Sequence, residues 1–317
     1  MIKLKKYNRE SILNKRITVI GLGISGKAAS ILANQLGAIV YASDSNSSEE
    51  IVSNAMELMH DHHIATETGI HTNKIYNSDL WIISPGVSAK SIIIKEAFNH
   101  NIPIVSEIEF ASWFTKFPII GITGSNGKTT TTYILNQMFK EGKKAGVIGG
   151  NIGIPFSECI LKEILQPPDD LVYLLEISSF QLEFISSFRP NFSIYTNISE
   201  DHLDRHYSMQ EYIKMKFRLV ENCKKNDTVV FNEDDDILKS IFHDSPLKKS
   251  TFGIKSYFPA GGPIKINLVI SGLFLNLPSI RGRSYGTSNV MLPGITNYLQ
   301  FAWPFFFFHL STLTKEK

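Results

Sequence analysis

The chain has 317 residues, 43% of them hydrophobic and 20% charged, with a formal net charge of +2. This is the composition of a globular protein with room for two domains, and a charge so near zero gives no basic field for nucleic acid or for an anionic membrane. No signal-peptide core follows Met1, and the apolar tract 301–310 is too short to cross a bilayer. Cys159 and Cys223 lack metal-type spacing, so we expect a protein of the reducing cytoplasm. We also expect a monomer.

The first third of the chain alternates strand-like and helix-like segments. Strands are predicted at 17–20, 39–42, 80–84 and 102–106, and helices at 27–36, 49–62 and 91–99. Because such alternation builds a parallel sheet with helices on its faces, we predict a Rossmann-like α/β domain over residues 1–116.

A second alternation begins at Ile119. The pattern predicts helices at 128–141 and 156–165 and strands at 145–150, 171–178, 192–199 and 227–232. Gly142 is suited to the C′ position that ends the first of these helices. A further helix at 208–224 opens on Ser208-x-x-Glu211, a capping box. We predict a central α/β domain with a mostly parallel sheet over residues 117–297, followed by an aberrant tail at 298–317.

The segment GITGSNGKTTTT, residues 121–132, resembles a phosphate-binding loop. It departs from the strict G-x-x-x-x-G-K-[ST] pattern because its first glycine is one position too early. The chemistry is still met, since backbone N–H groups and a helix N-terminus can face a phosphate, Lys128 adds a positive charge, and Thr129 offers a hydroxyl to Mg²⁺. The alternative is a glycine turn before an ordinary helix, but the strand before it and the helix after it favour a P-loop-like ATPase domain.

A second glycine loop, GLGISG at 21–26, fits G-x-G-x-x-G, and Asp44 ends the next strand, where a ribose-binding acid is expected. Taken alone, this loop suggests NAD, or a βα turn without a ligand. A dehydrogenase, however, needs no phosphate loop in its next domain. The two loops together therefore indicate two nucleotide-like ligands.

Three polar segments follow the phosphate loop: GGNIG at 149–153, LEISSFQLE at 175–183 and NISEDHLDRH at 197–206. Glu176 leaves the C-terminal end of an apolar strand, so its carboxylate could share a magnesium ion with Thr129. His202 and His206 are four residues apart, but the glutamate of an H-E-x-x-H zinc motif is missing, which disfavours zinc.

These segments resemble the Mur ligase family. The matching segments are GLGISG, SPGV, GITGSNGKTT, GNIG, LEISSFQLE, NISEDHLDRH and YIKMKFRL, in that order over residues 15 to 297. LEISSFQLE is similar to the family member that adds D-glutamate. The resemblance implies an ATP- and Mg²⁺-dependent ligase that joins D-glutamate to UDP-N-acetylmuramoyl-L-alanine through an acyl phosphate, in peptidoglycan precursor synthesis.

The resemblance also implies roles for single residues, with UDP in place of NAD at the first loop. The residues implied to hold the precursor are Ile24, Ser25, Asp44, Ser45, Ser84, Pro85, Gly86, Asn151, Ser178, Gln181 and His202. Those implied to bind ATP are Gly124, Ser125, Asn126, Gly127, Lys128, Thr129, Thr130 and Asn297. The implied metal ligands are Thr129, Glu176, His202 and a carbamate on Lys216, and the catalytic residues are Lys128, Glu176, His202 and Lys216.

The pattern around Lys216 supports one of these roles independently. Helix 208–224 has an apolar stripe of Tyr212, Met215, Leu219, Val220 and Cys223. Lys216 follows Tyr212 by four residues, so it points inward with the stripe, whereas Lys214 lies off the stripe. A buried amine loses its proton more easily and can then capture CO₂. The alternative is a lysine whose stem passes the stripe while its charge stays in water.

The resemblance ends near residue 297. The family pattern G-x-H-N-x-x-N meets Thr296 in place of histidine and Gln300 in place of the second asparagine, and only Asn297 is kept. We expect a truncated or frameshifted chain that lacks the family's third α/β domain and ligates D-glutamate poorly. Three other functions remain open: a remnant that only binds the precursor, a nicotinamide-dependent dehydrogenase, and a ligase similar to folylpolyglutamate synthase.

Overall fold

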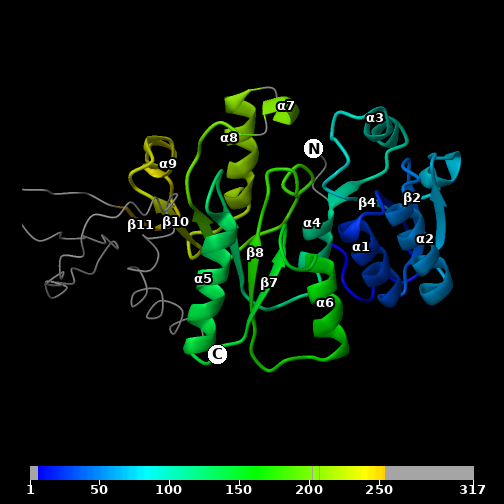
Figure 1. Ribbon diagram of the computed structural model, residues 1–317, viewed down its shortest axis with the longest axis horizontal. Helices are drawn as coiled ribbons and strands as arrows, with labels where there is room; N and C mark the ends of the chain where they lie inside the picture. The colour runs from blue at the N-terminus through cyan, green and yellow to red at the C-terminus, as the bar shows by residue number, and fades with distance from the viewer. Residues whose placement is uncertain (1–5, 202, 207, 254–317) are drawn as a thin grey trace, which may run out of the picture.

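A computed structural model describes residues 6–253 apart from 202 and 207. The predictions for His202, Asn297 and the tail at 298–317 lie outside the described residues. Within them the chain forms two parallel sheets with helices between and around them (Figure 1). The predicted α/β class, with a Rossmann-like first part and a mostly parallel second sheet, is confirmed.

The first sheet has the strand order β3-β2-β1-β4-β5, and all its strands are parallel. Its strands are β1 (Arg16–Ile20), β2 (Ile39–Asp44), β3 (Ala65–Thr68), β4 (Leu80–Ile83) and β5 (Ile104–Ser106). The helices of this part are α1 (Ile24–Gln35), α2 (Glu49–His62), α3 (Ile92–Asn99) and α4 (Glu107–Ser112), with a 3₁₀ turn at Asn73–Tyr76. Residues 17–20 of β1 are all buried, as expected for a central strand covered on both faces.

The second sheet has the order β11-β10-β9-β6-β8-β7, again all parallel. Its strands are β6 (Ile119–Thr123), β7 (Gly146–Gly150), β8 (Val172–Glu176), β9 (Phe192–Tyr195), β10 (Thr228–Asn232) and β11 (Lys248–Phe252). The helices are α5 (Lys128–Glu141), α6 (Phe156–Leu165), α7 (Leu203–His206), α8 (Met209–Phe217) and α9 (Asp236–Phe242), with a 3₁₀ turn at Arg218–Val220.

Both sheets reverse their strand order beside their first strand. The chain leaves β1 toward β2 and later returns to the other side of β1 as β4; likewise β9 returns to the other side of β6. Loops after such neighbouring strands run in opposite directions and leave a place for a ligand at the C-terminal edge of the sheet. Each glycine loop found in the sequence follows one of these first strands, so the topology places both loops at a switch point.

The two sheets share one hydrophobic core. A single buried cluster contains residues of both, including Ile17 and Ile82 from the first sheet and Tyr173 from the second. Helices α1, α4 and α6 lie side by side between the sheets (Figure 1) and contact one another. The relative positions of the two sheets are therefore set by helix packing.

The sequence located most helices and strands but did not predict β3, α4, α7, α9 and β11. The helix expected over 208–224 ends as an α-helix at Phe217 and continues as a 3₁₀ turn. Gly142 is the C-cap of α5, with φ −76°, so the prediction that it takes the C′ position was wrong. Lys143 has the left-handed φ of 55°, and Lys144 N donates to Phe139 O, which is the closing bond of a Schellman motif one residue later.

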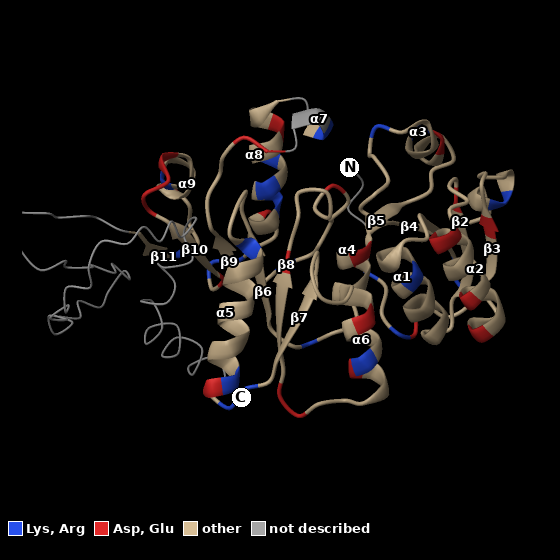
Figure 2. Ribbon diagram, viewed as in Figure 1, with Lys and Arg blue, Asp and Glu red and all other residues tan. Residues whose placement is uncertain are grey.

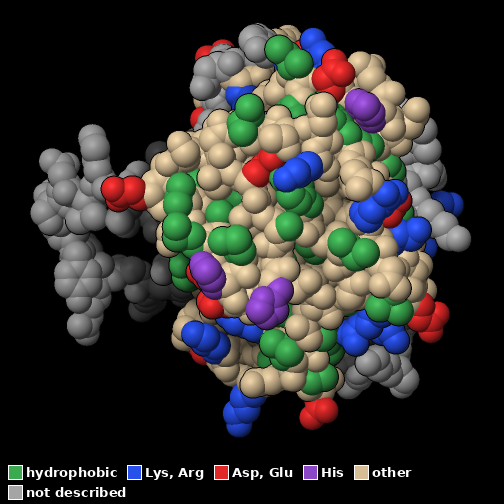
Figure 3. Space-filling view, turned by 90° about the vertical axis from the view of Figure 1, so that its right-hand side faces the viewer, with side chains coloured by type: hydrophobic (Ala, Val, Ile, Leu, Met, Phe, Trp, Pro, Cys, Tyr) green, Lys and Arg blue, Asp and Glu red, His purple; other side chains and the backbone are tan. Residues whose placement is uncertain are grey.

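The face of the first part that Figure 3 shows has no dominant charge. In Figure 3, hydrophobic side chains lie in small separate groups, and acidic and basic side chains are mixed among them. Among the described residues, no helix is long and apolar enough to cross a membrane.

Glu107 at the start of α4 is buried at the contact with α6. Its carboxylate accepts a hydrogen bond from Ser157 N, while its Oε2 has no partner among the described residues. Burial raises the pKa of Glu107 to about 7, despite the opposing hydrogen bonds from Ser157. The carboxyl group thus keeps its proton in the folded protein at a pH where the unfolded chain releases it.

We predict that the protein loses stability as the pH rises from about 4.5 to 7, because ionisation then favours the unfolded chain. The raised pKa of Glu107 corresponds to a loss of roughly 3 kcal/mol in the free energy of unfolding at pH 8. Glu107→Gln should remove most of this loss, which urea unfolding at pH 5 and pH 8 would measure. Glu141→Gln, at an exposed glutamate, is the control. An equal loss of stability in wild type and Glu107→Gln would contradict the prediction.

Candidate functional site

The loop after β6 depends on two glycines. Gly124 has φ +148°, and a Cβ there would lie 1.9 Å from Thr196 Oγ1. Gly127 has φ +81° and is the N-cap of α5. Any residue with a side chain would be strained at either place. The glycines therefore let the chain turn sharply from β6 into α5, close against the end of β9.

The residues after β9 hold this loop from the other side of the switch point. Asn197 O accepts from Ser125 N at 2.9 Å, and Asn197 Oδ1 accepts from Asn126 N at 2.9 Å. Ser125 Oγ donates to Ser199 O at 2.8 Å. The loop's first N–H groups are thereby satisfied within the protein. The N–H groups of the first turn of α5 have no acceptor within the helix, as at any helix N-terminus, and suit an anion.

Two lysines meet at one carbonyl of the loop. Lys128 Nζ donates to Gly124 O at 2.9 Å and to Ser125 O at 2.8 Å, and Lys216 Nζ donates to Gly124 O at 2.8 Å. Burial lowers the pKa of Lys128, although Glu176 and Asp201 oppose the shift. The amine predicted to face a phosphate is therefore held over the loop by carbonyl groups of the loop itself.

Lys216 is buried, as its place on the apolar stripe predicts. Only 1% of the residue is exposed, and its Nζ lies 4.7 Å from the centre of the Tyr212 ring, whereas Lys214 is exposed. Burial, together with the nearby Lys128 charge, lowers the pKa of Lys216 to about 7. The basic residues of α8 lie toward the C-terminal edge of the second sheet, where β8 ends in the acidic Glu176 (Figure 2). The amine is thus buried and easily deprotonated beside the phosphate loop.

Glu176, Thr129 and Asn151 meet at the end of β8. Thr129 Oγ1 donates to Glu176 Oε2 at 2.7 Å, and Asn151 Nδ2 donates to Glu176 Oε1 at 2.8 Å. A carboxylate and a hydroxyl this close can bind the same ion, and oxygen ligands suit Mg²⁺. The described residues contain no cluster of three or more His, Cys, Asp or Glu that could hold a metal alone, so other ligands would have to complete the site.

The first glycine loop has the same arrangement at the other switch point. Gly21 has φ +92° and a Cβ there would lie 2.7 Å from Ser84 Cβ, while a Cβ on Gly26 would lie 1.7 Å from Gly21 O. Asp44 Oδ2 accepts from Leu22 N at 2.7 Å, so the acid at the end of β2 touches the glycine loop. Ile24, at the start of α1, is 63% exposed.

The remaining predicted precursor residues lie near this edge or in the loop after β8. Ser45 directly follows β2, and Ser84, Pro85 and Gly86 follow β4. Ser25 lies in the first turn of α1. Gln181 Oε1 accepts from Ser178 N at 3.0 Å, so these two residues hold each other within the loop after β8.

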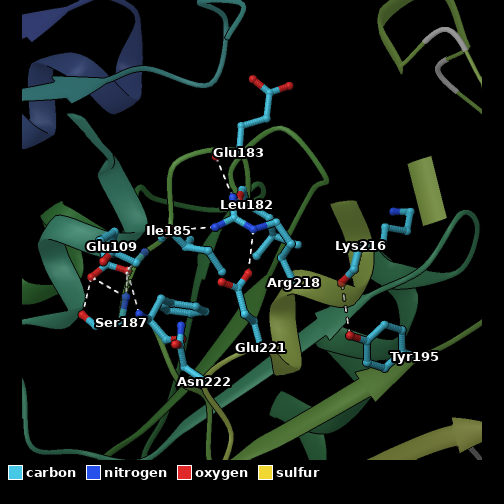
Figure 4. Close-up of polar contacts among 12 residues, drawn as sticks. Glu109, Leu182, Glu183, Ile185, Ser187, Tyr195, Lys216, Arg218, Glu221 and Asn222 are labelled. Atoms are coloured by element: carbon cyan, nitrogen blue, oxygen red, sulfur yellow. Dashed lines mark hydrogen bonds and ion pairs between the residues drawn. The ribbon is translucent and has the colours of Figure 1, made fainter. Parts of the chain in front are cut away.

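Two charged residues support that loop from outside it (Figure 4). The fully buried Glu109 of α4 accepts hydrogen bonds from the backbone N–H groups of Ser186, Ser187 and Phe188. Arg218, two residues after Lys216, donates to the carbonyl oxygens of Leu182, Glu183 and Ile185. The loop that carries Ser178 and Gln181 is thus tied both to the first part of the chain and to the helix of Lys216.

Arg205 of α7 forms a second link between the two parts. Its guanidinium donates to Pro85 O at 2.8 Å, Val87 O at 3.1 Å and Glu183 at 3.1 Å, and lies 4.1 Å from the centre of the Phe180 ring. His206 Nε2 is 2.8 Å from Ser179 Oγ, so this histidine has a hydrogen-bond partner without zinc.

Several of these residues were not predicted from the sequence. Asn197, Ser199 and Arg205 all lie in NISEDHLDRH, a segment in which only His202 has a predicted role. The carboxyl end of β9 is a usable signal, because a strand next to β6 must end beside the phosphate loop. The roles of Glu109 and Arg218 have no such signal, since both depend on contacts between distant segments.

Comparison with known proteins identifies the family. The Mur ligase middle domain matches residues 122–282, about half of the chain, and the MurD N-terminal domain matches residues 16–93. The chain belongs to the Mur ligase family. This confirms the resemblance seen in its seven segments.

Curated relatives support the same assignment. The chain is 40% identical over 253 residues to UDP-N-acetylmuramoylalanine–D-glutamate ligase of Chlorobium chlorochromatii, covering 77% of this chain and 53% of the relative. It is 41% identical over 240 residues to the protein of that name from Citrifermentans bemidjiense, covering 75% and 52%. The chain thus spans about half the length of the curated relatives it matches.

Solved structures show the same fold. A UDP-N-acetylmuramate:L-alanyl-gamma-D-glutamyl-meso-diaminopimelate ligase from Neisseria meningitides matches with a TM-score of 0.51 at 17% identity, over 81% of this chain and 85% of that one. A murein peptide ligase from Psychrobacter arcticus matches with a TM-score of 0.50 at 16% identity, over 75% and 53%.

We predict that Gly124→Ala destabilises the protein by roughly 2 kcal/mol or more, because a Cβ there is strained and meets Thr196 Oγ1. Gly86→Ala is the matched control, since a Cβ at Gly86 meets nothing within 4 Å. Urea unfolding of both variants would measure the difference. Equal stability of the two variants would show that the loop is not held as described.

Proposed function

We propose that this chain carries the ATP site and the UDP-precursor site of a ligase that joins D-glutamate to UDP-N-acetylmuramoyl-L-alanine in peptidoglycan precursor synthesis. The observation that carries the proposal is the loop after β6, where the Lys128 side chain bonds the loop carbonyls of Gly124 and Ser125, and Thr129 contacts Glu176. The names of the curated relatives support the assignment of these two substrates.

The first half of the proposed reaction is phosphoryl transfer. An oxygen of the precursor's L-alanine carboxylate attacks the γ-phosphorus of ATP, the bond to the β-phosphate oxygen breaks, and ADP leaves an acyl phosphate behind. The N–H groups at the start of α5 bind the phosphates, and Lys128 offsets their negative charge. Thr130, in the same first turn, and Ser125 and Asn126, held by the residues after β9, complete the proposed ATP loop.

The second half is amide formation. The amine nitrogen of D-glutamate attacks the acyl carbon, phosphate leaves, and the amine gives up a proton. Holding the amine close to the acyl phosphate can contribute about 7–11 kcal/mol to lowering the barrier. Poor ligation of D-glutamate by this chain stays a prediction, as do its cytoplasmic location and monomeric state.

Magnesium fits the oxygen ligands at the end of β8, and when bound it would neutralise charge on the transferred phosphate. Thr129 and Glu176 are the proposed ligands, and a carbamate on Lys216 would supply further oxygens. Lys216 supports this role by its burial and by the 2.8 Å bond that holds its Nζ at Gly124 O, next to Lys128.

We assign the two ligands to the two parts of the chain. Residues 1–116 bind the UDP portion at the loop after β1, through Ile24, Ser25, Asp44 and the segment after β4. Residues 117–297 bind ATP, and Ser178 and Gln181 hold the rest of the precursor. Arg205 connects the two sites by donating to Pro85 O after β4 and to Glu183 after β8, and Glu109 of α4 holds the same loop after β8. Arg218 ties that loop to the end of α8.

We predict that Lys128→Ala weakens ATP binding at least tenfold, because it removes the charge nearest the phosphate loop. Binding of the UDP precursor should be unchanged, since that site follows β1. Titration calorimetry with each ligand measures both effects. Lys140→Ala, at an exposed lysine of the same helix, is the control. If Lys128→Ala bound ATP as tightly as wild type, the proposed ATP site would be wrong.

We also predict a carbamate at Lys216. Protein equilibrated with ¹³C-bicarbonate should show a carbamate carbon signal by NMR that is absent in Lys216→Met. Lys214→Met, which changes the exposed lysine two residues earlier, should keep the signal. A wild-type spectrum without this signal, at saturating bicarbonate and Mg²⁺, would refute the modification.

A further inference from the structure

A cluster of polar residues next to the first switch point has no role in the function proposed above. It comprises Ser43 on β2, Glu67 on β3, and His71 and Thr72 in the turn that follows β3. Ser43 and Glu67 are register partners on neighbouring strands. Ser43 is fully buried and His71 is half-buried, so the cluster reaches from the sheet toward the surface.

Glu67 accepts every hydrogen bond that reaches its carboxylate. Thr72 N donates to Oε1 at 3.0 Å, Thr72 Oγ1 donates to Oε2 at 2.7 Å, and Ser43 Oγ donates to Oε1 at 2.7 Å. Burial raises the pKa of Glu67, but the hydrogen bonds from Thr72, Ser43 and Tyr41 outweigh it, and the pKa is lowered overall. The carboxylate is therefore ionised and can only accept.

This fixes the proton positions on Ser43 and His71. The Ser43 hydroxyl has one hydrogen, and it points to Glu67. Ser43 Oγ also lies 2.7 Å from His71 Nδ1, so at that contact the hydroxyl must accept and Nδ1 must carry the hydrogen. Burial lowers the pKa of His71, with Glu67 and Asp44 opposing the shift, so the ring is neutral at neutral pH. Its Nε2 is then a bare acceptor, with no hydrogen-bond partner among the residues that the structure describes.

His71 lies at the edge of the sheet where the UDP portion is proposed to bind. It comes three residues after β3, whose last residue, Thr68, is the register partner of Asp44. Asp44 in turn accepts from Leu22 N in the glycine loop. The His71 acceptor thus lies at the same C-terminal edge of the sheet as the loop after β1.

We propose that His71 Nε2 accepts a hydrogen bond from the uridine portion of the precursor, and so helps to select it; the proposal rests on the function proposed above. A uridine offers two kinds of donor to such an acceptor, the N3–H of uracil and the ribose hydroxyls. Cytosine has a lone pair at N3, so an acceptor facing that position would disfavour CDP.

The test is titration calorimetry of the full chain with UDP, CDP, 2′-deoxy-UDP and 3′-deoxy-UDP. Wild type should bind UDP about tenfold more tightly than the analogue that lacks the contacted donor. His71→Phe, which keeps a ring but has no acceptor, should bind UDP about tenfold more weakly and should lose that preference. His60→Phe is the control, because His60 is exposed in the last turn of α2, at the opposite edge of the sheet.

The nucleotide series also separates the two donors and the two proposals. Loss of the preference over CDP in His71→Phe assigns the contact to uracil, and loss of the preference over a deoxy analogue assigns it to the ribose. If wild type binds UDP and His71→Phe binds it equally well, the role of His71 is refuted while the UDP site stands. If wild type binds no UDP, both the site and the role of His71 are wrong.

A second measurement does not depend on the variant's folding. The ¹⁵N shifts of His71 in the wild-type protein report which ring nitrogen carries the hydrogen. We expect the hydrogen on Nδ1 at neutral pH and a change in the Nε2 shift on adding UDP. A hydrogen on Nε2 in the free protein would overturn the inference.

Discussion

The carbonyl oxygen of Gly124 accepts hydrogen bonds from two lysine side chains, the partly buried Lys128 and the buried Lys216. Gly124 has a φ of +148°, which favours glycine, and the absence of a Cβ allows Thr196 to lie so near. Two like charges at one acceptor repel each other, which helps to lower the pKa of Lys216. The loop thus concentrates positive charge where a phosphate is proposed to bind, and it makes one of its lysines easier to deprotonate.

The two halves of the chain position their glycine loops in the same way. In each sheet a glycine loop follows the first strand and is packed against the end of the strand beside it, β4 in one case and β9 in the other. The difference lies in what surrounds the loop. Asp44 accepts from the first loop at Leu22, whereas two lysines cover the second. Arg205 then joins the segment after β4 to the loop after β8, and Glu109 and Arg218 hold that loop against α4 and the end of α8.

The sequence predicted the fold class, both glycine loops and the burial of Lys216, because each is encoded locally by a glycine spacing or a helical period. It did not predict β3 and β11, whose short, polar sequences lack the apolar alternation of the other strands. It placed the left-handed residue of α5 at Gly142, since composition cannot show that Lys143 closes the Schellman motif. Glu109, Arg218 and the Ser43–Glu67–His71 cluster were beyond reach, because they depend on which distant segments the topology brings together.

The central claim is that the two glycine loops bind different ligands at the same time. Calorimetric titration of ADP with Mg²⁺ into the chain, alone and saturated with UDP-N-acetylmuramoyl-L-alanine, tests it most directly. The account predicts one ADP per chain in both titrations, with affinities that agree within about threefold. Displacement of ADP by the precursor, or binding of ADP only at the loop after β1, would contradict it.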